Sequence, residues 1–177
     1  MKFEKKVHEI IRVDLAGEKG AIEIYKGQLA VVRDKRLRKD IKLMLKKEKE
    51  HFEKFSELLV KYKVRPTLLD PLWKLGAFSL GAFSAILGKK ATMACTEAVE
   101  EVIIEHYESQ AKFLKGVDNK LSKITKKFAN DEKDHMIKAK NYGTGSDPLH
   151  KAFKAGVKNL SKIAIRVSLA NFFVILL

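Results

Sequence analysis

The chain has 177 residues, of which 46% are hydrophobic and 33% are charged, so it can fold around a substantial core and is not expected to be disordered. Its one cysteine, Cys95, excludes an internal disulfide and argues against a thiolate metal site. The formal net charge of +14 favours an anionic partner, but no arginine-glycine repeat, zinc knuckle or aromatic-rich strand supports nucleic-acid binding. We therefore expect no nucleic-acid partner, and a basic helical protein that binds nucleic acid is kept only as an alternative.

Apolar residues recur with helical spacing along the whole chain, and no segment shows the alternation of a β-strand. Breaks between helices fall at Pro66 and at the segment "NYGTGSDP", where proline and glycine disfavour helix. In chain order, the predicted helices cover residues 4–33, 35–62, 68–87, 91–114, 121–140 and from 149 towards the C-terminus. This pattern predicts an all-α bundle with short loops, formed by a single domain over residues 1–177.

Four of the predicted helices, those over residues 4–33, 35–62, 91–114 and 121–140, have an apolar stripe that is interrupted near its middle by a carboxylate. In two of these helices a histidine follows three residues later, in the motifs "EKEH" and "EKDH". The interrupting residues are, in chain order, Glu18, then Glu48 with His51, then Glu100, then Glu132 with His135. The single glutamates precede the paired ones by 30 and 32 residues, which indicates a duplicated helical hairpin.

Buried carboxylates of this kind need a positive partner, because an isolated one in an apolar interior costs several kcal/mol and neighbouring ones repel. The stripes carry no matching set of lysines or arginines, so two divalent cations are expected to balance the charge. Carboxylates and imidazoles without thiolates suit iron or manganese better than structural zinc. One Glu from each of two helices and Glu-x-x-His from each of two others is the ligand pattern of ferritin-like dimetal proteins. A single Glu-x-x-His would more often lie on a solvated helix face.

Four stretches of the sequence carry a resemblance to a known family. They are "IIRVDLAGEKGAIEIYKGQLAV" (residues 10–31), "EKEHFEKFSELLVKYKVRPTLLDPLWKLGAFSLGA" (48–82), "GKKATMACTEAVEEVIIEHYESQ" (88–110) and "FANDEKDHMIKA" (128–139). In this order they resemble the demethoxyubiquinone hydroxylases, a membrane-associated branch of the ferritin-like diiron carboxylate proteins. The resemblance covers residues 10–166.

The resemblance implies a ferritin-like four-helix bundle made of duplicated hairpins, with additional membrane-facing and C-terminal helices. It implies a diiron monooxygenase that uses O2 to hydroxylate the benzoquinol ring of a polyprenylated demethoxyubiquinol in ubiquinone biosynthesis. The family's ligands to two Fe2+ ions fall on Glu18, Glu48, His51, Glu100, Glu132 and His135. Other ubiquinone-biosynthesis proteins are possible partners.

The resemblance also assigns a role in electron delivery or substrate positioning to His106 and Tyr107. From the residues alone, Tyr107 is interpreted as core packing that borders the site. Leu15 and Met136 stand where the family usually has histidine, although neither position is a ligand in the pattern. Asp131 is a candidate acceptor for a ligating imidazole, with a solvent-facing position as the alternative.

Two apolar segments, residues 75–88 and 167–177, fall short of the roughly 20 residues needed to span a bilayer. We expect the helix over 68–87 to lie in the membrane surface with Trp73 as an interfacial anchor and to admit the polyprenyl tail; the alternative is an ordinary buried helix. The charged N-terminus does not resemble a signal peptide. The expected location is peripheral, on the cytoplasmic face of a bacterial inner membrane or on the mitochondrial inner membrane.

Other functions fit the same bundle. A ferritin-like iron oxidase or storage protein and a diiron hydroxylase of another substrate both remain alternatives. The sequence has no GxGxxG fingerprint, so the reductant is expected to come from outside or through the quinol itself.

Overall fold

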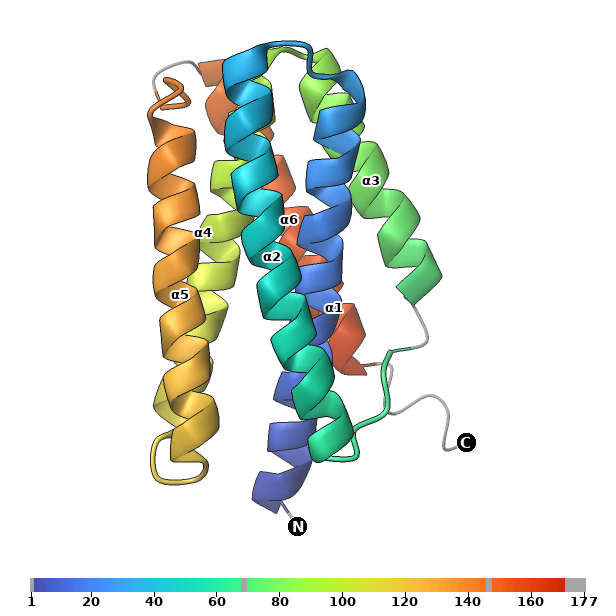
Figure 1. Ribbon diagram of the computed structural model, residues 1–177, viewed down its shortest axis with the longest axis vertical. Helices are drawn as coiled ribbons and strands as arrows, with labels where there is room; N and C mark the ends of the chain where they lie inside the picture. The colour runs from blue at the N-terminus through green and yellow to red at the C-terminus, as the bar shows by residue number, and fades with distance from the viewer. Residues whose placement is uncertain (1, 68–69, 146–147, 171–177) are drawn as a thin grey trace. The chain divides into compact units, whose positions relative to one another are not determined.

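The computed structural model describes residues 2–67, 70–145 and 148–170, and within these ranges it is helical, without β-strands. Its helices are α1 (Lys2–Val31), α2 (Lys35–Lys61), α3 (Asp70–Ile86), α4 (Lys89–Leu114), α5 (Asn119–Lys140) and α6 (Pro148–Ala170) (Figure 1). The predicted all-α fold of the ferritin-like type is therefore confirmed, with helix bounds a few residues from those expected. The expected helix start at 68 and most of the apolar C-terminal segment lie outside the described residues.

The helices belong to two compact units. The first holds α1, α2 and α3 together with the end of α6 from Lys162, and the second runs from Lys90 to Ser161. Each unit contains one antiparallel hairpin of long helices, α1–α2 or α4–α5, and each hairpin carries one copy of the predicted ligand pattern. The prediction of a single domain over residues 1–177 stays a prediction.

Hydrogen bonds from the side chains of Asp34 and Arg38 fix the turn between α1 and α2. Asp34 caps α2, because its Oδ1 accepts a hydrogen bond from the backbone N–H of Leu37 at 2.8 Å. Arg38 Nη1 donates to the carbonyl oxygens of Leu29 and Val32, both at 2.6 Å. These bonds satisfy carbonyl groups that the end of α1 leaves without intrahelical partners, and they place a cation near the negative end of its dipole. The turn therefore holds the α1–α2 hairpin in register.

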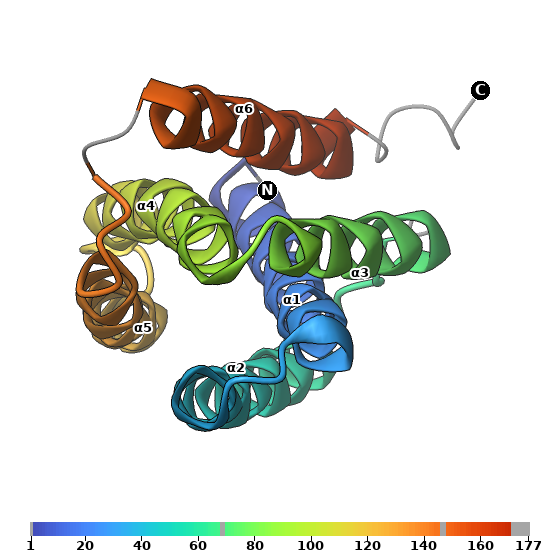
Figure 2. The same cartoon turned by 90° about the horizontal axis from the view of Figure 1, so that it is seen from above.

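The third helix packs on α1 at very short range. α1 packs against both α2 and α3, and Figure 2 shows α1 between them. A Cβ atom at Gly27 of α1 would overlap the carbonyl oxygen of Phe78, and one at Gly81 of α3 would overlap the carbonyl oxygen of Ile24. Glycine is therefore required at both positions for the two backbones to touch.

The outer face of α3 is exposed and apolar. Four of its side chains are more than half exposed, at 59%, 68%, 53% and 69% for Leu72, Leu75, Phe83 and Ile86. Their spacings of three, eight and three residues place them along one face of the helix. This finding opposes the alternative of an ordinary buried helix. In the part of the chain that the structure describes, no helix combines the length and apolar character needed to cross a membrane.

In the second unit, α4 is the central helix. Every residue from Ala91 to Glu100 is buried. The neighbouring α5 begins at a capping residue, Asp118, whose Oδ1 accepts from the backbone N–H of Leu121 at 2.9 Å. This arrangement places the middle of α4, where a predicted ligand lies, away from solvent.

Candidate metal centre

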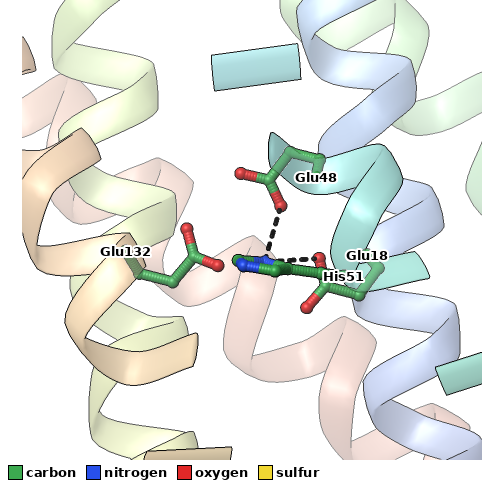
Figure 3. Close-up of side chains that lie close together, drawn as sticks. All are labelled: Glu18, Glu48, His51 and Glu132. Carbon is green, nitrogen blue, oxygen red and sulfur yellow. Dashed lines mark ion pairs between the residues drawn. The ribbon is translucent and has the colours of Figure 1, made fainter. Parts of the chain in front are cut away.

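The first unit brings together the three ligand residues predicted in its hairpin. Glu18 comes from α1, and Glu48 and His51 come from successive turns of α2. His51 Nδ1 lies 3.6 Å from Glu18 Oε2 and 3.9 Å from Glu48 Oε2 (Figure 3). All three side chains are at most 2% exposed, and each offers a ligand atom within 4.8 Å of the others. The spacing and the donors fit a shared cation.

The second unit repeats this arrangement. Glu100 comes from α4, and Glu132 and His135 come from successive turns of α5. His135 Nδ1 lies 2.9 Å from Glu132 Oε2 and 3.9 Å from Glu100 Oε1. The two carboxylates are at most 1% exposed and the imidazole is 7% exposed, and each residue offers a ligand atom within 4.8 Å of the others. The duplicated pattern in the sequence thus becomes two similar clusters.

The predicted ligand residues occupy core positions of otherwise apolar helix stripes. The buried residues of α2 are Leu37, Ile41, Met44, Glu48, His51, Phe55 and Leu58. Those of α5 are Leu121, Thr125, Phe128, Ala129, Glu132, His135 and Ala139. In both helices the spacing of three to four residues keeps the stripe on one face, so the glutamate and histidine point where a leucine would otherwise pack.

The donor chemistry fits a metal ion. Each cluster holds two carboxylates and one imidazole, which leaves two negative charges when the imidazole is neutral. Two such charges out of water repel, and a divalent cation would balance them. Oxygen and imidazole donors without sulfur suit iron and manganese among the transition metals. These buried Glu/His clusters can therefore hold metal ions.

The other predicted site residues are described by their packing, exposure and contacts. Tyr107 is 2% exposed and packs against Phe128 of α5, with ring centroids 6.4 Å apart and planes at 57°. His106 is partly exposed, and its Nε2 lies 2.8 Å from Gln110 Nε2. Asp131 is partly exposed. The roles of His106, Tyr107 and Asp131 in the chemistry stay predictions.

One buried carboxylate next to the second cluster was missed by the sequence reasoning. Glu97 of α4 is 4% exposed and lies one turn before Glu100. Its Oε1 and Oε2 atoms accept hydrogen bonds from Lys154 Nζ of α6 at 3.0 and 3.1 Å, and Oε2 also accepts from the Thr144 hydroxyl. The available signal was a charged residue inside the buried run "TMACTEAVE", but its partners are about 50 residues away in the sequence and have no spacing rule.

Comparisons with known proteins agree with the resemblance seen in the sequence. Residues 5–168 match the family described as ubiquinone biosynthesis protein COQ7. The chain is 45% identical over 165 residues to the NADPH-dependent 3-demethoxyubiquinone 3-hydroxylase, mitochondrial, of Dictyostelium discoideum, covering 92% of this chain and 76% of that protein. It is 41% identical over 166 residues to the human protein of the same name, with the same coverage. It is 38% identical over 163 residues to the 3-demethoxyubiquinol 3-hydroxylase of Rhodospirillum rubrum, covering 92% of this chain and 77% of that protein. The chain belongs to the ubiquinone biosynthesis protein COQ7 family.

Proposed function

We propose that this protein hydroxylates the benzoquinol ring of a polyprenylated demethoxyubiquinol in ubiquinone biosynthesis, with O2 as the oxidant. The relatives named above are 3-demethoxyubiquinone or 3-demethoxyubiquinol 3-hydroxylases, and they match nearly the whole chain. The observation that carries the proposal is the pair of buried Glu-Glu-His clusters at the positions of the family's ligand pattern.

The metal in this proposal is a pair of Fe2+ ions, held by Glu18, Glu48, His51, Glu100, Glu132 and His135 in one functional domain over residues 1–177. When bound, the iron pair would supply O2 activation. In the overall reaction one oxygen atom replaces a ring hydrogen and the other leaves as water. The quinol itself can supply the two electrons, in which case the product is the hydroxylated quinone. The chain contributes the charge balance of its four carboxylates and the exclusion of water from both clusters.

Changing one ligand on α2 tests the proposal against a matched change on the same helix. Glu48→Gln keeps the size of the side chain but removes one of the negative charges that balance the cation. We expect the iron content of purified protein, measured by mass spectrometry, to fall from two ions per chain to fewer than one. Hydroxylation should fall by more than the roughly 10- to 100-fold that loss of a ligand's supporting partner costs.

Glu53→Gln is the control, because Glu53 is an exposed residue of the same helix. In a strain that accumulates the demethoxy quinone, the intact protein and the Glu53→Gln variant should restore ubiquinone, whereas Glu48→Gln should not. Wild-type protein without stoichiometric iron, or an active Glu48→Gln variant, would contradict the proposal.

The outer face of α3 is proposed to bind the membrane that carries the polyprenylated substrate. Its support is the row of exposed apolar side chains on α3 together with the net charge of +14, which favours an anionic leaflet. The membrane would be the cytoplasmic face of a bacterial inner membrane or the mitochondrial inner membrane, and the relatives from Dictyostelium and human are named mitochondrial.

Liposome co-sedimentation tests this face. Replacing Leu75 and Phe83 together by glutamate should weaken binding by about tenfold or more, since burial of one such side chain is worth roughly 1.5–3 kcal/mol. Val60→Glu is the matched control, because Val60 is 75% exposed but lies on α2. Equal binding of the α3 variant and the wild type would rule out α3 as the membrane face.

A further inference from the structure

Three largely buried polar side chains form a network next to the second cluster, and the proposed chemistry makes no use of them. They are Glu97 of α4, Thr144 in the segment between α5 and α6, and Lys154 of α6. Glu97 and Thr144 are 4% and 1% exposed, and the side chain of Lys154 is 14% exposed. Within the second unit, α4 lies between α5 and α6 (Figure 2), and the network joins α4 to the two elements that follow α5.

Both carboxylate oxygens of Glu97 accept hydrogen bonds in this network. Its Oε2 accepts from the Thr144 hydroxyl and from Lys154 Nζ at 3.1 Å, and its Oε1 accepts from Lys154 Nζ at 3.0 Å. Stability alone does not call for such a group, because replacing a buried ion pair by apolar side chains is often neutral or stabilising. A satisfied polar network, in contrast, makes the structure around it rigid, because each hydrogen bond has a fixed direction.

Thr144 is coupled to the end of α5. The backbone N–H groups of residues 141–143 donate to carbonyl oxygens in the last turn of α5, at 3.2, 3.0 and 2.9 Å. Gly143 has a φ of +76°, in the left-handed region that glycine adopts at the end of a helix. Thr144 therefore follows a hydrogen-bonded turn that continues from α5, so the position of Thr144 and that of the end of α5 depend on each other.

The network is connected to the ligand residues of the second cluster through both α4 and α5. Glu97 precedes Glu100 by three residues on α4, a rise of about 4.5 Å along the helix. The other two ligand residues, Glu132 and His135, lie on α5, whose end is coupled to Thr144. The hydrogen bond from Thr144 to Glu97 therefore joins the two helices that supply this cluster. Since His135 Nδ1 lies 3.9 Å from Glu100 Oε1, a small shift between these helices would change the cluster.

We propose that Glu97 and Thr144 are positioning residues that hold the second cluster in the geometry that binds its metal ion, an inference that rests on the proposed iron pair. The first cluster lies in the other unit, and the residue one turn before its single glutamate is Leu15, whose side chain cannot form hydrogen bonds. The two ions of the chain should therefore differ in their dependence on this network. Its loss should weaken metal binding at the second cluster and leave metal binding at the first cluster unchanged.

Removal of the Thr144 hydroxyl tests the proposal with little change in side-chain size. Metal-free full-length protein is titrated with Fe2+ under anaerobic conditions, and binding is measured by calorimetry. In Thr144→Val the Kd of one ion should rise by roughly 10- to 100-fold, the usual cost of losing a ligand's supporting partner, while the Kd of the other ion stays within about twofold of its wild-type value. In crystals of this variant loaded with one Fe2+ per chain, anomalous diffraction at the iron edge should show the ion in the first cluster.

Two variants show whether the hydrogen bond to Glu97 is responsible. Thr144→Ser keeps the hydroxyl donor and should bind both ions like the wild type. Thr125→Val is the matched control, because Thr125 is a buried residue of α5 whose hydroxyl donates within its own helix, to the carbonyl oxygens of Leu121 and Ser122 at 3.2 and 3.1 Å. The control should leave both Kd values within about twofold of the wild type, since it removes no bond between elements. Equal weakening by Thr125→Val and Thr144→Val would overturn the proposal.

A double variant separates positioning from stability. Glu97→Leu/Lys154→Met replaces the ion pair by apolar side chains but provides no acceptor for the Thr144 hydroxyl. Its urea midpoint should lie close to that of the wild type, whereas its Kd at the second cluster should rise by about tenfold or more. Wild-type affinity for both ions in this variant would overturn the proposal, as would equal weakening of both ions in Thr144→Val.

Failure of the proposed function gives a different result. Wild-type protein that binds two Fe2+ ions but does not hydroxylate the demethoxyubiquinol contradicts the proposed function, while the Fe2+ titrations still decide this inference. Wild-type protein that binds two Co2+ ions but no Fe2+ contradicts the proposed iron pair, and the same titrations with Co2+ then decide whether the network positions the second cluster. Wild-type protein that binds neither metal overturns both proposals.

Discussion

The two helices that carry the single glutamates, α1 and α4, are each supported by an additional helix, but by different chemistry. α1 meets α3 through backbone contact at Gly27 and Gly81, where no side chain fits between the helices. α4 is tied to α6 by two ion pairs one turn apart, Glu97–Lys154 and Glu101–Lys158, the second at 2.7 Å. The ligand pattern is therefore duplicated, whereas the support behind it is not.

The difference extends to the residue one turn before each single glutamate. Leu15 stands before Glu18, and the charged Glu97 stands before Glu100. Short-range spacing within a helix decides where ligands can meet, and both hairpins keep it. Contacts with the supporting helix only need to hold the ligand helix in place, and close packing or ion pairing can serve equally well.

Removing the buried carboxylate of α4 should have the largest effect on stability. Glu97→Ala leaves Lys154, whose side chain is only 14% exposed, without its carboxylate partner and leaves the Thr144 hydroxyl without this acceptor. The free energy of unfolding, measured by urea titration at fixed metal content, should fall by about 2–4 kcal/mol. Glu101→Ala should cost less than about 1 kcal/mol, because its ion pair with Lys158 is partly exposed to solvent.

A double variant sharpens this prediction. Glu97→Leu with Lys154→Met replaces the buried pair by apolar side chains, so it should recover most of the stability that Glu97→Ala loses. Equal losses of stability in Glu97→Ala and Glu101→Ala would show that burial of the Glu97–Lys154 pair does not matter. In that case α6 would be held mainly by apolar packing.

Substitution of a glycine at the α1–α3 contact should have the next largest effect on stability. Gly27→Ala places a methyl group on the carbonyl of Phe78, so α3 must move away from α1. Overpacking of this kind costs roughly 1–3 kcal/mol, and the better helix propensity of alanine returns less than about 1 kcal/mol of it. The free energy of unfolding, measured by urea titration, should therefore fall by about 1–2 kcal/mol.

Two matched glycines test whether the effect belongs to the α1–α3 contact. Gly20 on α1 and Gly156 on α6 have open space where the methyl group of an alanine would lie, so alanine there should be neutral or stabilise by up to about 1 kcal/mol. Destabilisation by Gly156→Ala would mean that α6 also depends on close packing, and the contrast between the two units would disappear.

The helices and the clustering of the buried Glu and His side chains could be predicted because both depend on spacing within a helix. Glu48 and His51 were recognised because they interrupt an apolar stripe, and the structure places them in that stripe as buried residues. Glu97 and Arg38 could not be predicted, because their roles depend on partners brought close by the fold. The role of Gly27 was equally hidden, since the sequence does not say which helix approaches it.

The smallest effect should come from an exposed ion pair in the second unit, which contrasts with the buried pair of Glu97. Lys133 Nζ of α5 lies 2.5 Å from Glu108 Oε1 of α4, and this hydrogen bond is the main cause that lowers the pKa of Glu108 below its usual value. A carboxyl with a lowered pKa in the folded state adds stability above its unfolded pKa of about 4.3, and this stability is lost as the pH falls through the folded value. In metal-free protein at pH 6, the free energy of unfolding of the wild type, measured by urea titration, should exceed that of Glu108→Gln by less than about 1 kcal/mol, because the pair is exposed. The difference should disappear at pH values well below 4, and a difference that grew on acidification would mean that the pair does not favour the charged carboxylate.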